Sequence, residues 1–579
     1  MWRASNAVRR PANFLPPAWL DPEPVSSQHW PGVPPTPSLR LGSVAQGLLL
    51  ALALAACRSD RSDQAVAAPG DASVRLVVLI VVDQLPSWSF DAALPSLEGG
   101  LARLVERGIH FTRAELPFAG TFTASGHASL ATGAPPSVHG IVANDWHRAT
   151  GERSLGATVD PGDMTLQSSR QLRVDGVADV LERQTAGKSR TVSLALKDRS
   201  AILAIGRRPD LAIWYDPAHA AMTTSRFYTA KPPSWLRELA SDRPASRFFR
   251  SEWRPIAQRL VVRLAGGADD QAGELGNDGF DASFPHSLAE VPDPAKAIIN
   301  TPFGTDVLFD AAEAALRGEA MGIDEVPDLL AISVSSHDHA GHGWGQESWE
   351  RVDVMLRLDQ RLAAFLDHLD RTVGAGKVAV VLTSDHGATR LIERVQSAGG
   401  DAVRIEKPVV RQAAERAAQK ALGVGPWVRG ISGNMIHVTR AFSDQPRAQR
   451  DIAIRDMVVA VRAIPGMGLV APTADLAGDC ARHREPVWRM ACLSLPEGPL
   501  GPILLLARDG SHIAGDHPWG ASHGGASADE RTVPVIIAAP GHSRARRDQT
   551  VSLLSIAPTL SALLGVAAPP AARAPPLTL

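Results

Sequence analysis

The stretch VRLVVLIVVD, residues 74–83, decides the fold class of this chain. From Leu76 to Val82 every residue is apolar, without the alternation that a strand with one solvated face shows. Such a run is typical of a strand that is buried on both faces of a parallel sheet. Further strand-like runs follow at residues 191–196, 210–215, 329–336, 378–384 and 532–540.

Helical patterns alternate with these runs, the clearest at residues 306–318, 349–370 and 411–422. The alternation predicts an α/β fold with a mostly parallel central sheet flanked by helices, and we place one catalytic domain at residues 74–567. Residues 568–579 are rich in Ala and Pro and are predicted to be disordered. Three regions interrupt the alternation and are predicted to be insertions or a cap around the active edge of the sheet: 240–295, 390–435 and 440–518.

The N-terminal segment indicates export. After Arg40, the apolar run LGSVAQGLLLALALAAC is short for a transmembrane helix and is typical of a signal peptide, so residues 1–57 are predicted to be a signal region. The run ends in LAAC, which looks like a bacterial lipobox and predicts a lipid on Cys57; an ordinary cleavable signal is the alternative. The polar residues 58–73 would form a flexible tether. By resemblance to bacterial lipoproteins, Arg58 rather than Asp after the Cys favours a periplasmic protein anchored to the outer membrane by this lipid, its only expected membrane contact.

Charge and cysteine content indicate which partners and which cellular compartment to expect. With 59 basic and 61 acidic residues, the chain gives no electrostatic reason to expect a nucleic-acid partner. If Cys57 is lipidated, Cys480 and Cys492 remain as a pair that an oxidising compartment would join in a disulfide. Two unrelated buried thiols are the alternative. Nothing in the sequence indicates an oligomeric state.

Six carboxylate and imidazole side chains lie in four separated pieces of the chain, each adjoining a strand-like run. In parallel sheets, sites form at the carboxyl ends of strands. Asp338 and His342 are four residues apart, so a helical turn would place them on one face. The number of ligands suits two divalent ions better than one, and zinc accepts carboxylate and His together. The six residues are Asp83, Asp338, His342, Asp385, His386 and His523.

The segment TFTASGHASLATG, residues 121–133, offers a hydroxyl nucleophile in Thr121, Thr123 or Ser125. A hydroxyl at a helix N-terminus is favoured as an alkoxide, because the free N–H groups and the helix dipole stabilise negative charge. Spacing alone does not choose among the three. The alternative is a Ser/Thr-rich turn that only caps a helix. With two metals, a nucleophile indicates a hydrolase acting on phosphate.

Cationic side chains for phosphate follow the run at 191–196. In an extended segment Lys197 and Arg199 would point to the same side and could hold the non-bridging oxygens of a phosphoryl group. A surface turn is the alternative. Asn144 is a further potential donor.

Together these motifs resemble the alkaline phosphatase superfamily, most closely its PafA-type monoesterase branch, from about Val74 to about Gly565. The matching pieces are VVDQ (81–84), the block from Thr123 to Trp146, KDRSAILAIG (197–206), SSHDHAGH (335–342), SDHG (384–387) and SHGG (522–525).

The resemblance implies two Zn²⁺ ions. One would take Asp83, Asp385 and His386, the other Asp338, His342 and His523, with Thr123 as nucleophile between them. Asn144, Lys197 and Arg199 would contact phosphate, and the Lys-x-Arg pair separates this branch from the diesterases.

The implied activity is an exported phosphate monoester hydrolase that acts on small phosphorylated substrates through a phosphothreonine. The alternatives are a phosphodiesterase or phosphonate hydrolase on the same scaffold, and a non-catalytic surface lipoprotein that binds metal.

Overall fold

The structure is a computed structural model that describes residues 74–147, 154–498, 500–515 and 520–579. All of them belong to one compact unit, which spans Val66–Leu579. The predicted signal region, the tether and Cys57 lie outside the described residues. Among the described residues, no helix combines the length and the apolar character that crossing a membrane requires.

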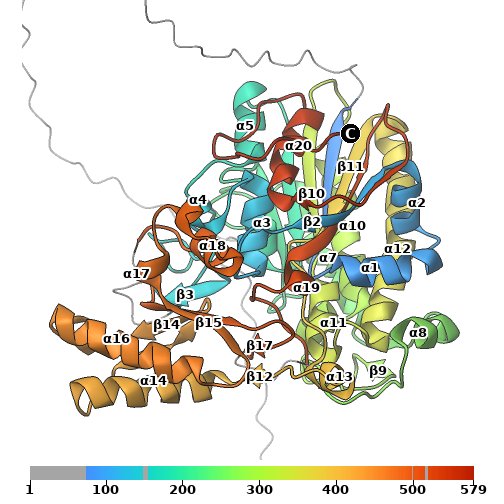
Figure 1. The fold of residues 1–579 in the computed structure, drawn as a ribbon. Helices are drawn as coiled ribbons and strands as arrows, with labels where there is room; N and C mark the ends of the chain where they lie inside the picture. The colour runs from blue at the N-terminus through green and yellow to red at the C-terminus, as the bar shows by residue number, and fades with distance from the viewer. Residues whose placement is uncertain (1–73, 148–153, 499, 516–519) are drawn as a thin grey trace, which may run out of the picture. The chain divides into compact units, whose positions relative to one another are not determined.

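The predicted strands all belong to one ten-stranded sheet (Figure 1). At its centre β1 pairs in parallel with β10 and β11, and β5 and β6 continue the parallel order. The predicted parallel core is therefore confirmed, but the sheet is mixed, because β18 runs antiparallel between β11 and β2. The order is β19 (Ala545–Arg547), β2 (Ile109–Glu115), β18 (Thr532–Ala538), β11 (Val378–Thr383), β1 (Leu76–Val82), β10 (Asp328–Val334), β5 (Thr191–Ala195), β6 (Leu211–Asp216) and β7 (Ala221–Thr223), with β20 (Val551–Ser552) paired to β2.

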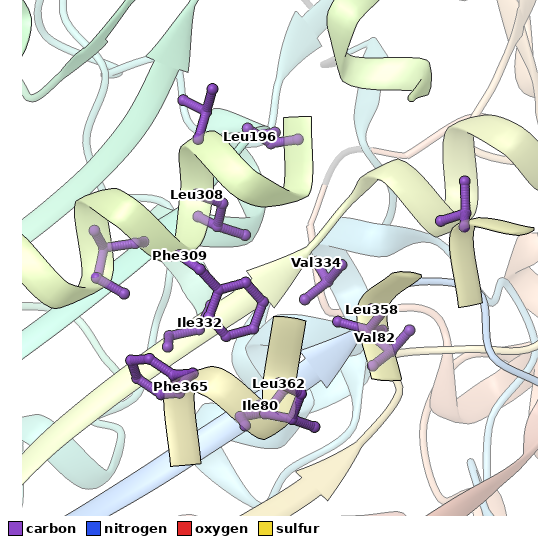
Figure 2. Close-up of a cluster of buried hydrophobic side chains, with 14 of the residues drawn as sticks. Ile80, Val82, Leu196, Leu308, Phe309, Ile332, Val334, Leu358, Leu362 and Phe365 are labelled. Carbon is purple, nitrogen blue, oxygen red and sulfur yellow. The ribbon is translucent and has the colours of Figure 1, made fainter. Parts of the chain in front are cut away.

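Helices cover both faces of the sheet, which explains why β1 needs apolar side chains throughout. Ile80 and Val82 point to one face, where they pack with side chains of α10 (Pro302–Gly318) and α12 (Trp349–Leu369) (Figure 2). Val77, Leu79 and Val81 point to the other face and pack with residues of α3 (Thr123–Thr132), α5 (Val177–Gln184) and α20 (Ile556–Leu563). A strand with an alternating pattern would leave polar side chains under one helical layer.

The two later interruptions of the fold form one unit. A second sheet has the order β13 (Val428–Ser432), β14 (Met435–Val438), β16 (Ile503–Ala507) and β15 (Met467–Pro472). β13 lies in the predicted insertion at 390–435 and β16 in that at 440–518, and β14 pairs with both, so the two insertions form a single small α/β layer. Its helices α14 (Lys407–Leu422) and α16 (Arg447–Arg462) pack on one face, and its other face meets α3.

The cysteine pair stabilises a loop of this layer. Cys480, in the 3₁₀ helix η5 (Cys480–Arg482), is joined by a disulfide to Cys492 in α18 (Pro486–Leu493), with the Cα atoms 5.5 Å apart. The interruption at 240–295 lies on α12, where Trp253 Nε1 donates to Asp353 Oδ2 at 2.7 Å.

The prediction that residues 568–579 are disordered is wrong. The side chains of Leu577 and Leu579 pack against the core cluster beneath α20. The backbone N–H of Leu577 also donates to Thr559 Oγ1 at 2.9 Å. The two leucines bury apolar surface, which stabilises the ordered tail, although the segment as a whole is rich in Ala and Pro.

His139, at the end of α4 (Pro136–His139), should make stability depend on pH. Its Nδ1 accepts a hydrogen bond from the Ile141 N–H at 3.1 Å, so Nε2 carries the proton toward Ser129. Burial lowers the pKa of His139 to about 3. Between about pH 6.5 and pH 3 the unfolded chain therefore binds one more proton at this residue than the folded chain, and stability falls as the pH falls through that window.

His139→Asn keeps an acceptor for Ile141 and removes this proton. We expect the loss of unfolding free energy between pH 6 and pH 4 to shrink by up to about 1.4 kcal/mol per pH unit. Urea titrations at several pH values measure it. An unchanged pH slope would contradict a neutral buried His139.

Candidate active site

The predicted site residues come together at one edge of the main sheet. Asp83 follows β1, Asp385 follows β11, and Lys197 follows β5, so parallel pairing brings these strand ends to the same edge. His523 precedes its strand, and in an all-parallel sheet it would lie at the far edge. Because β18 is antiparallel to β11, its beginning lies at the active edge instead.

One cluster of ligand atoms is formed by Asp338, His342 and His523. Asp338 and His342 lie on α11 (Ser336–Trp344), and the predicted helical spacing places His342 Nε2 3.3 Å from Asp338 Oδ1. His523 Nε2 approaches the same oxygen at 3.6 Å. A carboxylate and two imidazoles thus converge from two distant segments.

The second cluster contains Asp83 and Asp385, and it also contains His127, which sequence reasoning missed. His127 Nε2 lies 3.6 Å from Asp83 Oδ1, and its Nδ1 lies 3.3 Å from Asp385 Oδ2. His386, the predicted ligand, has its Nε2 3.2 Å from Asp385 Oδ2. The available signal for His127 was its position one helical turn after Thr123, on the same face of α3.

The histidines of the site are arranged as metal ligands are. Nδ1 of His342, His386 and His523 lies 3.0, 2.8 and 2.6 Å from the carbonyl oxygens of Ala521, Gly387 and Thr121. A carbonyl can only accept, so each Nδ1 carries the proton and each Nε2 keeps a lone pair facing a carboxylate. A lone pair beside a carboxylate is unfavourable unless a cation joins them. The residues therefore fit divalent metal, with backbone carbonyls fixing the tautomer.

Electrostatics keeps two of the carboxylates ionised. Burial opposes the charge on Asp83 and Asp338, but Lys197 Nζ lies 3.1 Å from Asp83 Oδ2 and 2.5 Å from Asp338 Oδ2. Lys197 and then His127 lower the pKa of Asp83 to about 2, and Lys197 holds the pKa of Asp338 well below its usual range. Both carboxylates are thus prepared to bind a cation.

For His386, His523 and Asp385, in contrast, the surroundings shift the pKa so that the neutral form is favoured. Burial lowers the pKa of His386 to about 4, and burial together with His386 and His342 holds that of His523 well below its usual range. Both rings are therefore neutral at pH 7, as ligands must be. Burial and the neighbouring Asp83 raise the pKa of Asp385, whose buried Oδ2 has no hydrogen bond of normal geometry. A metal cation at this oxygen would stabilise the charged form.

Lys197 and Arg199 do not form the extended pair that the sequence suggested. Lys197 has extended backbone angles, but α6 begins at Asp198 (Asp198–Leu203), so Arg199 is helical and the two residues do not share an extended segment. The Arg199 Nη1 lies 3.9 Å from Asp198 Oδ1, and its Nε is buried without a hydrogen bond. Burial, and then the charges of Lys197 and, more weakly, Arg199, lower the pKa of His339 to about 3, so both cations act on the α11 side of the site.

Of the three candidate hydroxyls, Thr123 faces the ligand clusters. Its Oγ1 lies 3.3 Å from His386 Nε2, and the residue is the first of α3. Thr121 Oγ1 instead accepts from the Gly524 N–H at 2.9 Å, and Ser125 Oγ donates to the carbonyls of Gly120 and Phe122 at 3.0 Å. The hydroxyls of Thr121 and Ser125 therefore hold the backbone.

Asn144 lies beside this helix start. Its Oδ1 accepts from the Ala124 N–H at 2.9 Å, which fixes the amide next to Thr123. Asn144, His342 and His523 line a cavity of about 230 Å³, together with Lys407 and the tip of the β13–β14 hairpin at Gly433. The second sheet thus forms one wall of the site, as expected of a cap.

Three further residues that the sequence did not single out support the clusters. Ser333 Oγ donates to Asp83 Oδ1 at 2.5 Å. Gln84, which has a left-handed φ of 63°, donates from Nε2 to Asp338 Oδ1 at 2.6 Å and from its backbone to Asp385 Oδ1 at 3.2 Å. Gly126 allows α3 to approach, since a Cβ there would meet the Asp385 carbonyl oxygen at 2.4 Å. These contacts join both clusters into one unit.

Comparison with known proteins agrees with this geometry. The model of the type I phosphodiesterase / nucleotide pyrophosphatase family matches residues 77–420. Alkaline phosphatase PafA of Elizabethkingia meningoseptica is 28% identical over 87% of this chain and 94% of its own length. Alkaline phosphatase PhoV of Synechococcus elongatus is 31% identical over 55% of this chain and 60% of its own length.

The crystal structure of wild-type PafA is similar in three dimensions as well. It aligns with a TM-score of 0.79 at 26% identity, over 87% of this chain and 98% of its own. The fold is therefore that of alkaline phosphatases, as the motifs implied. The chain belongs to the type I phosphodiesterase / nucleotide pyrophosphatase family and is a hydrolase of the alkaline phosphatase superfamily.

Proposed function

We propose that this protein is an exported phosphate monoester hydrolase that uses two Zn²⁺ ions and Thr123 as its nucleophile. The observation that carries the proposal is the position of the Thr123 hydroxyl, 3.3 Å from His386 Nε2 at the start of α3 and facing two clusters of ligand atoms. Asp83, Asp385 and His386 would hold one ion, and Asp338, His342 and His523 the other. Small phosphorylated compounds would be the substrates.

The chain's own residues can carry the reaction in two steps. Thr123 Oγ attacks phosphorus in line and displaces the alcohol, and water then hydrolyses the phosphothreonine. The N–H groups and dipole at the start of α3 stabilise negative charge on Thr123. Zinc, when bound, supplies Lewis-acid charge that lowers the pKa of the hydroxyl and stabilises the leaving oxygen. Asn144, fixed by the Ala124 N–H, and Lys197 would contact the equatorial oxygens.

Support for a monoester substrate comes from charge. Lys197 is buried and its pKa is raised: burial lowers it, but the nearby carboxylates of Asp338 and Asp83 more than offset that effect. A fixed cation of this kind is matched to a phosphoryl group that carries two negative charges rather than one. The names of PafA and PhoV, both alkaline phosphatases, favour the same reading.

The proposal is tested by the turnover of p-nitrophenyl phosphate against bis-p-nitrophenyl phosphate, before and after chelation. We expect the monoester to be preferred, and activity to disappear on chelation and return with Zn²⁺. Preference for the diester would make the protein a phosphodiesterase. Metal binding without turnover of either compound would leave the alternative of a non-catalytic lipoprotein.

Replacing Lys197 and Arg199 together by Ala should lower monoester turnover much more than diester turnover. The reason is that a monoester presents the more highly charged phosphoryl group in the transition state. The ratio of kcat/KM for the two substrates measures the effect, and metal content must be determined too, because Lys197 contacts Asp83 and Asp338. An equal loss on both substrates with both metals retained would assign the pair a general role.

We further propose that Cys57 is the lipidated N-terminus of the mature protein and anchors it in the outer membrane. The support is the LAAC sequence after an apolar run and the polar tether that follows it. Cys57→Ser should release or mislocalise the protein without changing its kinetic constants, because the tether precedes the catalytic domain. Mass spectrometry of the native protein checks it, and an unmodified Cys57 inside an uncleaved chain would contradict it.

A further inference from the structure

A second cavity lies away from the ligand clusters and is lined by arginines. It has a volume of about 440 Å³, within the range of sites for small organic ligands. Four arginines line it, together with two aromatic residues, and none of the predicted catalytic residues is among the lining. The six are Arg170, Arg207, Arg208, Arg226, Phe227 and Tyr228.

Topology places this cavity at the opposite edge of the sheet from the catalytic residues. Arg207 and Arg208 precede β6, whose carboxyl end is at the active edge, and Arg226 follows β7. Because β7 is antiparallel to β6, its end returns to the edge where β6 begins. The residues before β6 and after β7 therefore meet at this edge and line the cavity together. The cavity is separate from the one at Asn144.

The positive charge in this cavity is only partly balanced. Arg170 Nη1 lies 3.2 Å from Asp160 Oδ2, and Arg207 Nη1 lies 3.6 Å from Asp175 Oδ1. Across the part of the chain that the structure describes, Arg208 and Arg226 have no carboxylate within 4.0 Å of their guanidinium groups. The guanidinium groups of Arg208 and Arg226 are therefore not paired with a carboxylate at contact distance and can approach an anion. Arg226 also lies near enough to Asp163 to add to the hydrogen bonds from Thr165 in lowering the pKa of that carboxyl.

A buried donor in the wall also lacks a partner. The Nε of Arg207 is buried without a hydrogen bond, and the buried hydroxyl of Tyr228 lies beside Ser169. An unsatisfied buried donor is unfavourable, and an anionic oxygen would satisfy it. Phe227 adds an apolar wall, with Arg170 5.2 Å above its ring. Guanidinium groups, a hydroxyl and a ring together suit a phosphoryl group that carries an apolar substituent.

We propose that this cavity is a second, non-catalytic site that binds a small organic phosphate. The arginines would hold the phosphoryl oxygens, and Phe227 would contact the organic group. Inorganic phosphate could supply the same oxygens, but it fills only part of 440 Å³. The site does not depend on the proposed catalytic function.

The test counts binding sites for phenylphosphonate, whose carbon–phosphorus bond a phosphatase does not cleave, on the metal-loaded full chain by equilibrium dialysis. We expect two equivalents on the native protein, one in each cavity. Arg208→Ala with Arg226→Ala should lose one equivalent and keep its monoester turnover. Arg440→Ala with Arg447→Ala removes two arginines of 90% and 88% side-chain exposure and should keep both equivalents.

Tyr228→Phe refines the test without removing charge. It should weaken the second site roughly threefold to tenfold, because it deletes one hydroxyl donor to the anion and keeps the aromatic ring. Parallel titration with inorganic phosphate shows whether the organic group contributes, and tighter binding of phenylphosphonate is the expected result. Equal binding of inorganic phosphate would reassign the site to the free ion.

Failure of this site is distinguishable from failure of the catalytic proposal. If the catalytic cavity binds nothing, the native protein holds one equivalent and the Arg208→Ala, Arg226→Ala variant holds none, which still supports the second site. If native protein and variant bind the same number of equivalents, the second site does not exist. Equal loss in the Arg440→Ala, Arg447→Ala control would reduce the effect to net charge.

Discussion

Thr123→Ala is expected to abolish monoester turnover while both metals stay bound. The variant keeps every carboxylate and imidazole of the two clusters and removes only the hydroxyl that lies 3.3 Å from His386 Nε2. The covalent route through phosphothreonine then disappears, and the loss of transition-state stabilisation should exceed roughly 3 kcal/mol. Steady-state kinetics together with metal analysis measures both parts of the prediction.

Ser125→Ala is the matched control, because Ser125 lies on the same helix and its hydroxyl donates only to backbone carbonyls. It should retain most of the activity. Rapid acid quenching of the native protein with labelled substrate should recover phosphate on Thr123. Near-native turnover of Thr123→Ala would move the nucleophile to Thr121 or Ser125.

Asp385→Asn and His523→Ala are each expected to empty one metal site and abolish activity. Asn is the same size as Asp, but its amide nitrogen at the position of Oδ2 would donate to His386 Nε2, 3.2 Å away, and block both ligand atoms. His523→Ala removes the ring that faces Asp338 Oδ1 at 3.6 Å. Loss of a supporting residue alone lowers metal affinity about 10- to 100-fold, so loss of a ligand should cost more.

Metal content per chain, measured after dialysis against a weak chelator, should fall from two to one in each variant. His542→Ala, which removes an exposed histidine, should leave it at two. Two equivalents of metal in both ligand variants would overturn the ligand assignment. If the native protein bound only one equivalent of metal, the residues could still be ligands, but the site would hold one ion instead of two.

Sequence patterns predicted the core of the fold because they report burial directly. The unbroken apolar run from Leu76 to Val82 requires cover on two faces, and the structure supplies it with α10 and α12 on one face and α3, α5 and α20 on the other. The prediction for the C-terminal tail was wrong, because the composition of that segment does not reveal the contacts of its two leucines. Leu577 and Leu579 pack on the core although their segment is rich in Ala and Pro.

In the site, too, some contacts could be predicted from the sequence and others could not. Asp338 and His342 could be paired from their spacing, since one helical turn relates them wherever the helix lies. Lys197 and Arg199 could not, because the pairing assumed an extended segment and α6 begins between them. His127 was missed because its one signal, a position one helical turn after Thr123, does not reveal the distant carboxylates that it contacts.

The sequence by itself determined the class of fold, the chemical types of the candidate ligands and the segment that holds the candidate nucleophile. Those properties depend on residue identity and on short-range periodicity, which the chain carries locally. Spacing left Thr121, Thr123 and Ser125 open and only the family resemblance favoured Thr123. The tertiary structure gives the physical reason that Thr123 faces the clusters, because the backbone around Gly524 and the turn at Gly120 occupy the other two hydroxyls. It also decided that His523 reaches Asp338, since only the antiparallel direction of β18 brings the beginning of that strand to the edge where the parallel strands end.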